Sequence, residues 1–357
     1  MTLPPFADDP PASAASGASG ATGAPGSIGS PTMSDVARHA GVSPMTVSRA
    51  LRDDPRVSPE TKTRVMGAVN ALGYRRNEAA RNLRLGRASG LVGLVVTNLA
   101  NPFYSQLALG VEAMADENGT RVMLGNSGED VARERQLVRD FASRRLDGII
   151  VVPAGSDHGH LQPAQLAGIP VVLAASPPIK FEADAVLLDD FGGSWDATQH
   201  LVEAGHRKIA FLGLQASTWT GSERFRGYCA ALEEAGIPLD DRIISRRQRD
   251  VAAAEQAMLE LLDIEDPPTA VFTANNRNTI GAYRAIRARR PDVALAGFDD
   301  FELADMLSLP LTVISYDPRE LGRRAAELLR DRIDNPQAQH AARRVVLPTR
   351  LVEYGLA

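Results

Sequence analysis

Short apolar runs alternate with longer helical stretches through most of the chain from residue 91 onward. Such alternation predicts an α/β fold in which parallel sheets carry helices on both faces. Nine runs are predicted to be strands: Leu91–Val96, Arg121–Leu124, Gly148–Val152, Val171–Leu173, Val186–Leu188, Lys208–Leu212, Ala270–Thr273, Val293–Ala296 and Thr312–Ser315. The main helical stretches between them are Phe103–Glu117, Val131–Arg144, Trp195–Glu203, Ser222–Ala235, Val251–Leu262 and Thr279–Arg289.

The number and order of these strands predict two lobes. The strands divide naturally near Asp189, and we expect the chain to cross back between the lobes towards its end. Ligands of open parallel sheets bind beyond the carboxyl ends of the strands. The cleft between the two lobes is therefore the predicted small-molecule site.

The pattern is different in residues 33–76, where we expect three short helices. The first ends at Gly41. Ser43 then caps a second helix that has Pro44 at its first position. The same cap recurs at the start of the third helix, Ser58–Leu72, and Gly73 follows it as a stop signal.

The pattern of this three-helix segment is typical of a helix-turn-helix module, in which the second helix presents its N-terminal side chains to base edges. Arg49 suits a bidentate contact with guanine, and Met45 suits an apolar contact with a thymine methyl group. Thr46 and Ser48, with the free amides at the helix start, suit phosphate contacts. The candidate DNA contacts in this helix are Ser43, Pro44, Met45, Thr46, Ser48 and Arg49.

The distribution of charge agrees with a DNA-binding module. Residues 33–90 hold eleven Lys and Arg against five Asp and Glu, a net charge of +6, whereas the whole chain carries −5. A basic module on an acidic body is the electrostatic footprint of nucleic-acid binding. Residues 1–32 are rich in Ala, Ser, Gly and Pro and are predicted to be a disordered leader.

Several other classes of protein are disfavoured. The single cysteine, Cys229, excludes an internal disulfide and a cysteine-based zinc site. The chain shows neither a long apolar run nor a signal peptide, so we expect a cytoplasmic protein rather than a membrane or transport protein. The six histidines lack metal spacing, and neither a phosphate-binding loop nor a nucleophile elbow is present. We therefore expect no enzyme activity, no cofactor and no metal.

The amino-acid sequence of the three-helix segment resembles that of a known family. The segment Asp35–Leu51, with Val57–Thr61 and Leu72–Arg75 after it, resembles the headpiece of the lac repressor family. The resemblance runs from about Met33 to the C-terminus, and Val42–Arg49 is most similar to the gluconate-type branch.

This resemblance implies a helix-turn-helix headpiece over 33–76, a hinge helix and linker over 77–90, and a two-lobed, periplasmic-binding-protein-like core over 91–357. It also implies a homodimeric transcriptional regulator that binds a palindromic operator. We expect a repressor of a catabolic operon, controlled by a sugar, a sugar acid or a related metabolite. A global regulator controlled by a protein partner is the alternative.

Residues Asn77–Arg84 match the hinge helix of the family, which folds on operator binding in relatives. Leu83 holds the position of the leucine that relatives insert into the minor groove, and Asn77 and Arg81 are further expected DNA contacts. An inserted apolar side chain unstacks a base step and bends the duplex. So short a helix is unstable alone and can act as an order–disorder switch. A plain interdomain linker is the alternative.

The core matches the family's effector-binding segments at several places. The resemblance implies that Phe103 stacks on the ligand, although an aromatic there could equally belong to the core. It also implies that Arg224 clamps hydroxyls or carboxylates, that Asn275 contacts the ligand and that Asp299 accepts from sugar hydroxyls. Trp219, expected in the loop Gln215–Gly221, either caps the cleft or is simply half-buried.

Two departures from the family pattern bear on the ligand. Ala174 stands where sugar-binding relatives often carry aspartate, and Asn276-Arg277 replaces the usual acidic residue and its neighbour. Together these changes add positive charge near the cleft. They favour a less hydroxylated or an anionic ligand over a neutral polyol.

Overall fold

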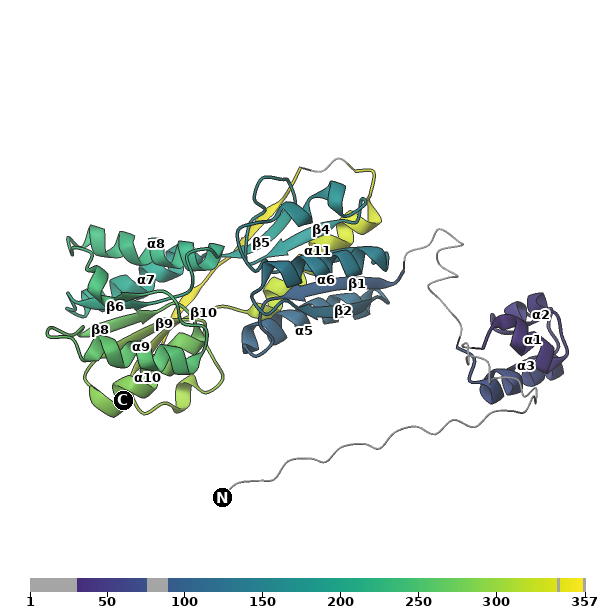
Figure 1. The fold of residues 1–357 in the computed structure, drawn as a ribbon, viewed down its shortest axis with the longest axis horizontal. Helices are drawn as coiled ribbons and strands as arrows, with labels where there is room; N and C mark the ends of the chain where they lie inside the picture. Colours follow the sequence, from purple (N-terminus) through teal and green to yellow (C-terminus); the bar gives the residue numbers. More distant parts are fainter. Residues whose placement is uncertain (1–30, 76–88, 339–340, 356–357) are drawn as a thin grey trace, which may run out of the picture. The chain divides into compact units, whose positions relative to one another are not determined.

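The chain forms two compact units, residues 1–78 and 79–357, and the computed structural model describes residues 31–75, 89–338 and 341–355 (Figure 1). The hinge helix predicted at 77–84, with Asn77, Arg81 and Leu83, lies outside the described residues. Most of the predicted leader lies outside them too. Its last residue, Thr32, caps the first helix.

The first unit contains the three predicted helices, α1 (Met33–Ala40), α2 (Pro44–Ala50) and α3 (Pro59–Leu72). A hydroxyl caps each of them: Thr32, Ser43 and Ser58 each accept a hydrogen bond from the backbone amide three residues later. Gly41 has φ +63°, a left-handed conformation that glycine adopts without strain, and it allows the tight turn between α1 and α2.

Small aliphatic side chains from all three helices form the core of this unit. Val36, Val47 and Val65 are completely buried, one from each helix. Val42 and Leu51 are partly buried and pack at the edge of the core. The unit is therefore held together by a small aliphatic core and by the three side-chain caps of its helices.

The second unit has two lobes, each with a six-stranded sheet. The first sheet has the order β11-β5-β4-β3-β1-β2 and contains β1 (Leu91–Val96), β2 (Arg121–Asn126), β3 (Gly148–Val151), β4 (Val171–Ala174), β5 (Asp184–Leu188) and β11 (Arg344–Leu347). The second has the order β12-β10-β9-β8-β6-β7 and contains β6 (Ile209–Leu212), β7 (Ile244–Ser245), β8 (Ala270–Thr273), β9 (Ala294–Phe298), β10 (Leu311–Ser315) and β12 (Arg350–Tyr354).

The nine predicted strands are all present, with ends shifted by at most two residues. The sequence reading missed β7, β11 and β12. Each of these lies at an edge of its sheet, where one side of the strand has no neighbour and the side chains can stay polar. The pairing is parallel except between β10 and β12, which run antiparallel.

Helices cover both faces of each sheet, as the alternating pattern predicts. In the first lobe, α5 (Pro102–Glu117) and α11 (Pro318–Asp334) pack on one face and α6 (Val131–Ser143) on the other. In the second lobe, α9 (Val251–Leu262) and α10 (Asn276–Arg289) cover one face, and α7 (Asp190–Glu203) and α8 (Trp219–Glu234) cover the other. The sequence reading missed α11.

Two glycines let α5 and α11 approach each other closely. A Cβ atom at Gly110 would collide with the carbonyl oxygen of Arg319, and one at Gly322 would collide with that of Leu107. The close contact ties the start of α11, which follows a crossing between the lobes, to the helix that carries Phe103 at its N-terminus.

The chain crosses between the lobes three times, after β5, after β10 and between β11 and β12, as the yellow C-terminal segment in Figure 1 illustrates. The division predicted near Asp189 is confirmed, because β5 belongs to the first sheet and α7 to the second lobe. Within the described ranges, no helix has the length and apolar character needed to cross a membrane.

Candidate functional site

The N-terminal end of α2 is presented to solvent in the first unit. Ser43 Oγ accepts the amide of Thr46 at 3.1 Å and lies 2.9 Å from the Thr46 hydroxyl, so these two side chains fix the helix start. Pro44 is exposed, and Met45 is 58% exposed although its side chain is large and apolar. An exposed methionine on a rigid, capped helix start is available to an external partner.

Ser48 and Arg49 are half-buried. They lie in the last turn of α2, where Arg52 Nε donates to the Ser48 carbonyl. The nearby carboxylate, Asp54, is held by both ends of the Arg56 guanidinium at 3.0 and 2.7 Å. In the described part of the chain, no carboxylate lies within ion-pair distance of Arg49, which leaves its guanidinium open for a ligand.

The second unit has a cleft lined by the carboxyl ends of strands from both lobes. The first lobe contributes Thr97 after β1, Pro153 and Ala154 after β3, and Ser176 after β4. The second lobe contributes residues that follow β6, β7, β8, β9 and β10: Gln215, Gln248, Arg249, Asn275, Asp299 and Tyr316. This is the place that the strand order predicts for a ligand.

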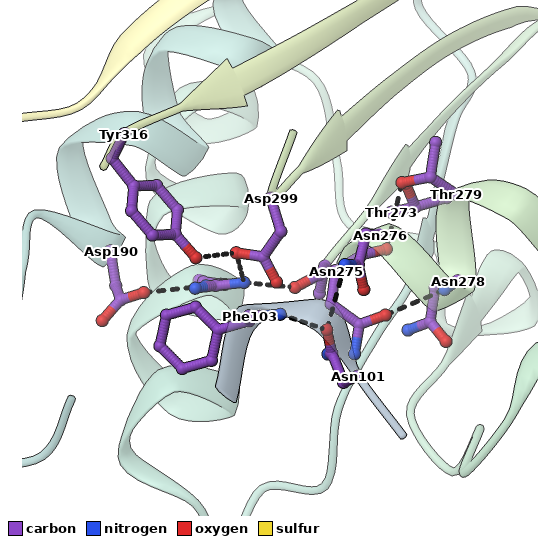
Figure 2. Close-up of polar contacts among 12 residues, drawn as sticks. Asn101, Phe103, Asp190, Thr273, Asn275, Asn276, Asn278, Thr279, Asp299 and Tyr316 are labelled. Carbon is purple, nitrogen blue, oxygen red and sulfur yellow. Dashed lines mark hydrogen bonds and ion pairs between the residues drawn. The ribbon is translucent and has the colours of Figure 1, made fainter. Parts of the chain in front are cut away.

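Arg224, on α8, is the centre of a buried network in the floor of the cleft. Its Nε donates to Asp190 Oδ1 at 2.8 Å, and its Nη1 donates to the Ala274 carbonyl at 2.7 Å and to Asp299 Oδ1 at 3.0 Å. The guanidinium lies 3.6 Å from the centre of the Phe298 ring. Figure 2 shows how Asp190, Asp299 and Tyr316 converge on this point.

Several polar groups of the network stay open. Tyr316 donates to Asp299 Oδ1 at 2.6 Å, which leaves Asp299 Oδ2 without a hydrogen bond to any described residue. Nη2 of Arg224 is likewise unused within the described ranges. A donor and an acceptor, both held rigidly and next to each other, match a pair of ligand hydroxyls.

The sequence reading missed Asp190, which is 2% exposed and completes the network. Burial raises the pKa of Asp190 to about 6, although the Arg224 guanidinium beside it acts in the opposite direction. Its Oδ2 is buried without a hydrogen-bond partner among the described residues. The two carboxylates and one guanidinium form a compact charged cluster that fixes the orientation of Arg224.

Aromatic side chains form the wall that faces this floor. Phe103 lines the cleft and also packs against the core of the first lobe. Its ring meets that of Tyr104 edge-on, with centroids 4.9 Å apart, and that of Tyr316 at 6.1 Å. Asn101 fixes the start of α5 by accepting the amide of Phe103.

Consecutive asparagines at the start of α10 have different tasks. Asn275 caps the helix, with its Oδ1 accepting the amide of Asn278 at 2.8 Å, and its side-chain amide group borders the cleft. Asn276 Nδ2 donates to Asn101 Oδ1 at 3.1 Å and thereby joins the two lobes across the cleft. Figure 2 shows this bridge between the asparagines.

Trp219 is in α8 and not in a loop as expected. Thr218 caps the helix, and Trp219 is its first residue, half-buried and lining the cleft. The Arg344 guanidinium lies 5.6 Å from its ring centre. The cap at Thr218 was a readable signal for the earlier helix start.

A second buried pair supports the cleft wall of the first lobe, and the sequence reading missed it as well. Glu134 is 1% exposed; its Oε1 lies 2.9 Å from His160 Nε2, and its Oε2 accepts the amide of Ala154 at 2.6 Å. Ala154 lines the cleft. No group of three or more His, Cys, Asp or Glu side chains in the described ranges is arranged to hold a metal ion.

Comparison with known protein families identifies both units. The model for bacterial regulatory proteins of the lacI family matches residues 32–77. The model for periplasmic binding proteins and the sugar binding domain of the LacI family matches residues 89–354, which is most of the chain. The chain belongs to the lacI family. It is a DNA-binding transcriptional repressor of that family, and the resemblance drawn from its headpiece is confirmed.

Relatives of this lacI-family chain match it over nearly their whole length. The ribose operon repressor of Escherichia coli (strain K12) is 32% identical over 331 residues, covering 91% of this chain and 99% of the relative. The solved complex of the transcriptional regulator CelR with cellobiose is 33% identical, with a TM-score of 0.67, and covers 90% of this chain and 98% of the other.

The lac repressor dimer bound to operator and the anti-inducer ONPF is 27% identical, with a TM-score of 0.74. That match covers 90% of this chain and 97% of the lac repressor chain. The similarity of Val42–Arg49 to the gluconate-type branch of the family stays a prediction.

Proposed function

We propose that this lacI-family chain is a homodimeric repressor of a catabolic operon, and that a small hydroxylated metabolite bound in the cleft controls its affinity for a palindromic operator. The observation that carries the proposal is the pair of open groups on Arg224 and Asp299 between two lobes. The ribose operon repressor and the complex of CelR with cellobiose support a sugar-like metabolite. The lac repressor dimer on its operator supports the assembly.

In this proposal the chain divides into a DNA-binding headpiece at 33–76, a hinge at 77–90 and an effector-binding and dimerisation core at 91–357. The chain acts by binding, without a catalytic step or a cofactor. Because its target is operator DNA, the proposal places it in the cytoplasm with the nucleoid.

The start of α2 is the proposed reading surface. Met45 and Arg49 contact bases, because one is exposed and apolar and the other has an open guanidinium. Ser43, Pro44, Thr46 and Ser48 lie along the phosphates and set the register. In the hinge, Asn77 and Arg81 add contacts and Leu83 inserts into the minor groove.

A hinge test is independent of the core. Leu83→Ala should weaken operator binding and reduce the bend, because no apolar side chain then holds a base step open. The bend is measured by the electrophoretic mobility of circularly permuted operator fragments. An unchanged bend angle would show that Leu83 does not insert.

The cleft is the proposed effector site. Arg224 donates to a ligand hydroxyl through Nη2, Asp299 accepts through Oδ2, and the Asn275 amide group adds a donor. Phe103 and Trp219 provide aromatic surface on either side, against which the apolar face of a sugar ring can pack.

Ligand binding between lobes can change DNA binding because it changes the balance between lobe arrangements. The bond between Asn101 and Asn276 belongs to the arrangement seen here. A metabolite that contacts both lobes favours the arrangement that fits it, and it shifts operator affinity only as far as its affinities for the two arrangements differ.

The proposal is tested by selecting operators from random DNA with the full-length protein. We expect the selection to yield a palindrome, in which each headpiece of the dimer binds one half-site. Repeating the selection with candidate metabolites should change the yield at the same palindrome. If no metabolite changes the yield and a protein captured from lysate does, the protein-controlled alternative replaces the metabolite-controlled one.

A further inference from the structure

The charged side chains that line the cleft are unevenly balanced. They are Glu129, Arg224, Arg249, Arg277 and Asp299. Arg224 is compensated by Asp299 and Asp190 within the buried network. Arg249 and Arg277 are different: no carboxylate in the described ranges lies within ion-pair distance of either guanidinium. Two uncompensated positive charges therefore border the proposed effector.

Further arginines extend this charge at the mouth of the cleft. A shallow hollow lined by Ser245, Arg246, Arg247 and Arg249 continues from the cleft, since Gln215 and Arg249 line both. Arg246 lies 4.2 Å from the centre of the Phe225 ring and donates to the Gly221 carbonyl, and it too lacks an ionic partner among the described residues. Clefts lined by one sign of charge concentrate ligands of the opposite sign.

The acidic groups nearby do not cancel this charge. Asp250, next to Arg249, is exposed, and its Oδ1 accepts the amide of Ala253 as the cap of α9. Glu129 comes from the opposite lobe, is exposed, and its Oε1 accepts from the Asn98 amide at 3.2 Å. Arg249 is exposed as well, so solvent screens its charge and these carboxylates alike, and the half-buried Arg277 carries the less screened positive charge of the two arginines.

Arg277 decides the sign that the ligand must have. It is half-buried already, at the start of α10 beside the interlobe bridge. A neutral ligand that fills the cleft removes water from this guanidinium and offers no charge in return, which costs free energy. An anionic ligand group offsets that cost through charge-assisted hydrogen bonds.

We propose that the effector is a polyhydroxylated anion, with its phosphate or carboxylate held by Arg249 and Arg277 and its hydroxyls held by Arg224, Asp299 and Asn275. This inference rests on the proposed function of the cleft. It makes Arg249 and Arg277 the residues that determine specificity, while the buried network provides the recognition that neutral and anionic ligands share.

The test uses the full-length protein and a matched ligand panel in a thermal-shift assay followed by titration calorimetry. The panel contains glucose, galactose, ribose, xylose and cellobiose, each as the neutral sugar, the aldonic acid and a phosphate ester. Binding is expected only in the anionic arms. Whether the acid or the phosphate ester binds identifies the anionic group, and its affinity should fall as the salt concentration rises.

Two variants sharpen the result. Arg277→Gln and Arg249→Gln should each weaken binding of the anion about 10- to 100-fold, the usual range for a lost hydrogen bond to a charged group. Arg226→Gln is the matched control, because Arg226 is an exposed arginine of α8 that pairs with Glu223 and does not line the cleft. It should leave the affinity unchanged.

Tight binding of a neutral sugar that Arg277→Gln leaves unaffected would overturn the anionic effector and keep the metabolite-controlled repressor. Binding of an anion that neither variant weakens would overturn the assignment of Arg249 and Arg277. Absence of binding anywhere in the panel would overturn the inference as well, and together with unchanged operator selection it would contradict the proposed function itself.

Discussion

The start of α2 and the effector cleft are built in opposite ways. The start of α2 is an exposed surface fixed by one hydroxyl cap, with Met45 in solvent and Arg49 without an ion pair to any residue that the structure describes. The cleft floor is a buried charge cluster in which Asp190, Arg224 and Asp299 hold one another. A side chain of the first region can change without disturbing the fold, whereas one of the second cannot. DNA specificity and stability should therefore be separable, while effector binding and stability are coupled.

The largest effect is expected at the cleft floor. Arg224→Ala leaves Asp190 buried without its cation and should lower the free energy of unfolding by about 3–5 kcal/mol at pH 8. Urea unfolding of the variant measures this loss, and effector binding should disappear with it. Arg226→Ala, an exposed neighbour on α8, should change stability by less than about 0.5 kcal/mol. Equal stability of the two variants would mean that the buried cluster is not coupled to the fold.

The pH dependence of stability sharpens the same contrast. Because burial raises the pKa of Asp190 to about 6, the folded state binds its proton more tightly than the unfolded state does. The stability linked to this proton is fully present below pH 4 and is lost as the pH rises towards 6. Asp190→Asn should remove this dependence from the unfolding curve between pH 4 and 6. The same slope in protein and variant would assign it to other groups.

In α2, Arg49→Ala should weaken operator binding by about 1–3 kcal/mol and relax discrimination at one base position. Fluorescence anisotropy with single-base operator variants measures both quantities. The free energy of unfolding should stay within about 0.5 kcal/mol of the parent, since Arg49 makes no ion pair with a described residue. A uniform loss across all operators would instead make Arg49 a phosphate contact.

The smallest effect is expected at the bridge between the lobes. Asn276→Ala removes the hydrogen bond to Asn101 and should change effector affinity by about 2- to 10-fold, as expected for one neutral hydrogen bond. Calorimetry with the ligand found in the panel measures this change. Stability should fall only slightly, and operator specificity should be unaffected. A complete loss of effector binding would show that Asn276 contacts the ligand directly.

The features that could be predicted from the sequence are those that depend on neighbouring residues. The caps at Ser43 and Ser58 and the strand runs of both lobes could be located from nearby residues, because caps and apolar runs are short-range signals. Arg224 and Asp299 were singled out only because the segments around them resemble those of the family. The start of α8 at Trp219 was misplaced because its cap, Thr218, lies outside the apolar pattern.

The remaining features depend on residues far apart in the chain. Asp190 joins the network through a contact with Arg224, 34 residues later, and Asp299 is 75 residues from that arginine. Nothing in the sequence near Asp190 distinguishes it from a capping aspartate. The helix α11 was missed because arginines and acidic residues fill most of its surface, with only a stripe around Leu321, Ala325 and Leu329 buried.

Control of operator binding by a cleft ligand is tested by measuring operator affinity with and without the ligand. Anisotropy titrations would use the selected palindrome, the full-length protein and the best anion of the panel at saturating concentration. We predict at least a tenfold change in operator affinity, and no change in Arg224→Ala at a temperature where that variant is folded. An operator affinity that is the same with and without every bound ligand would contradict the account.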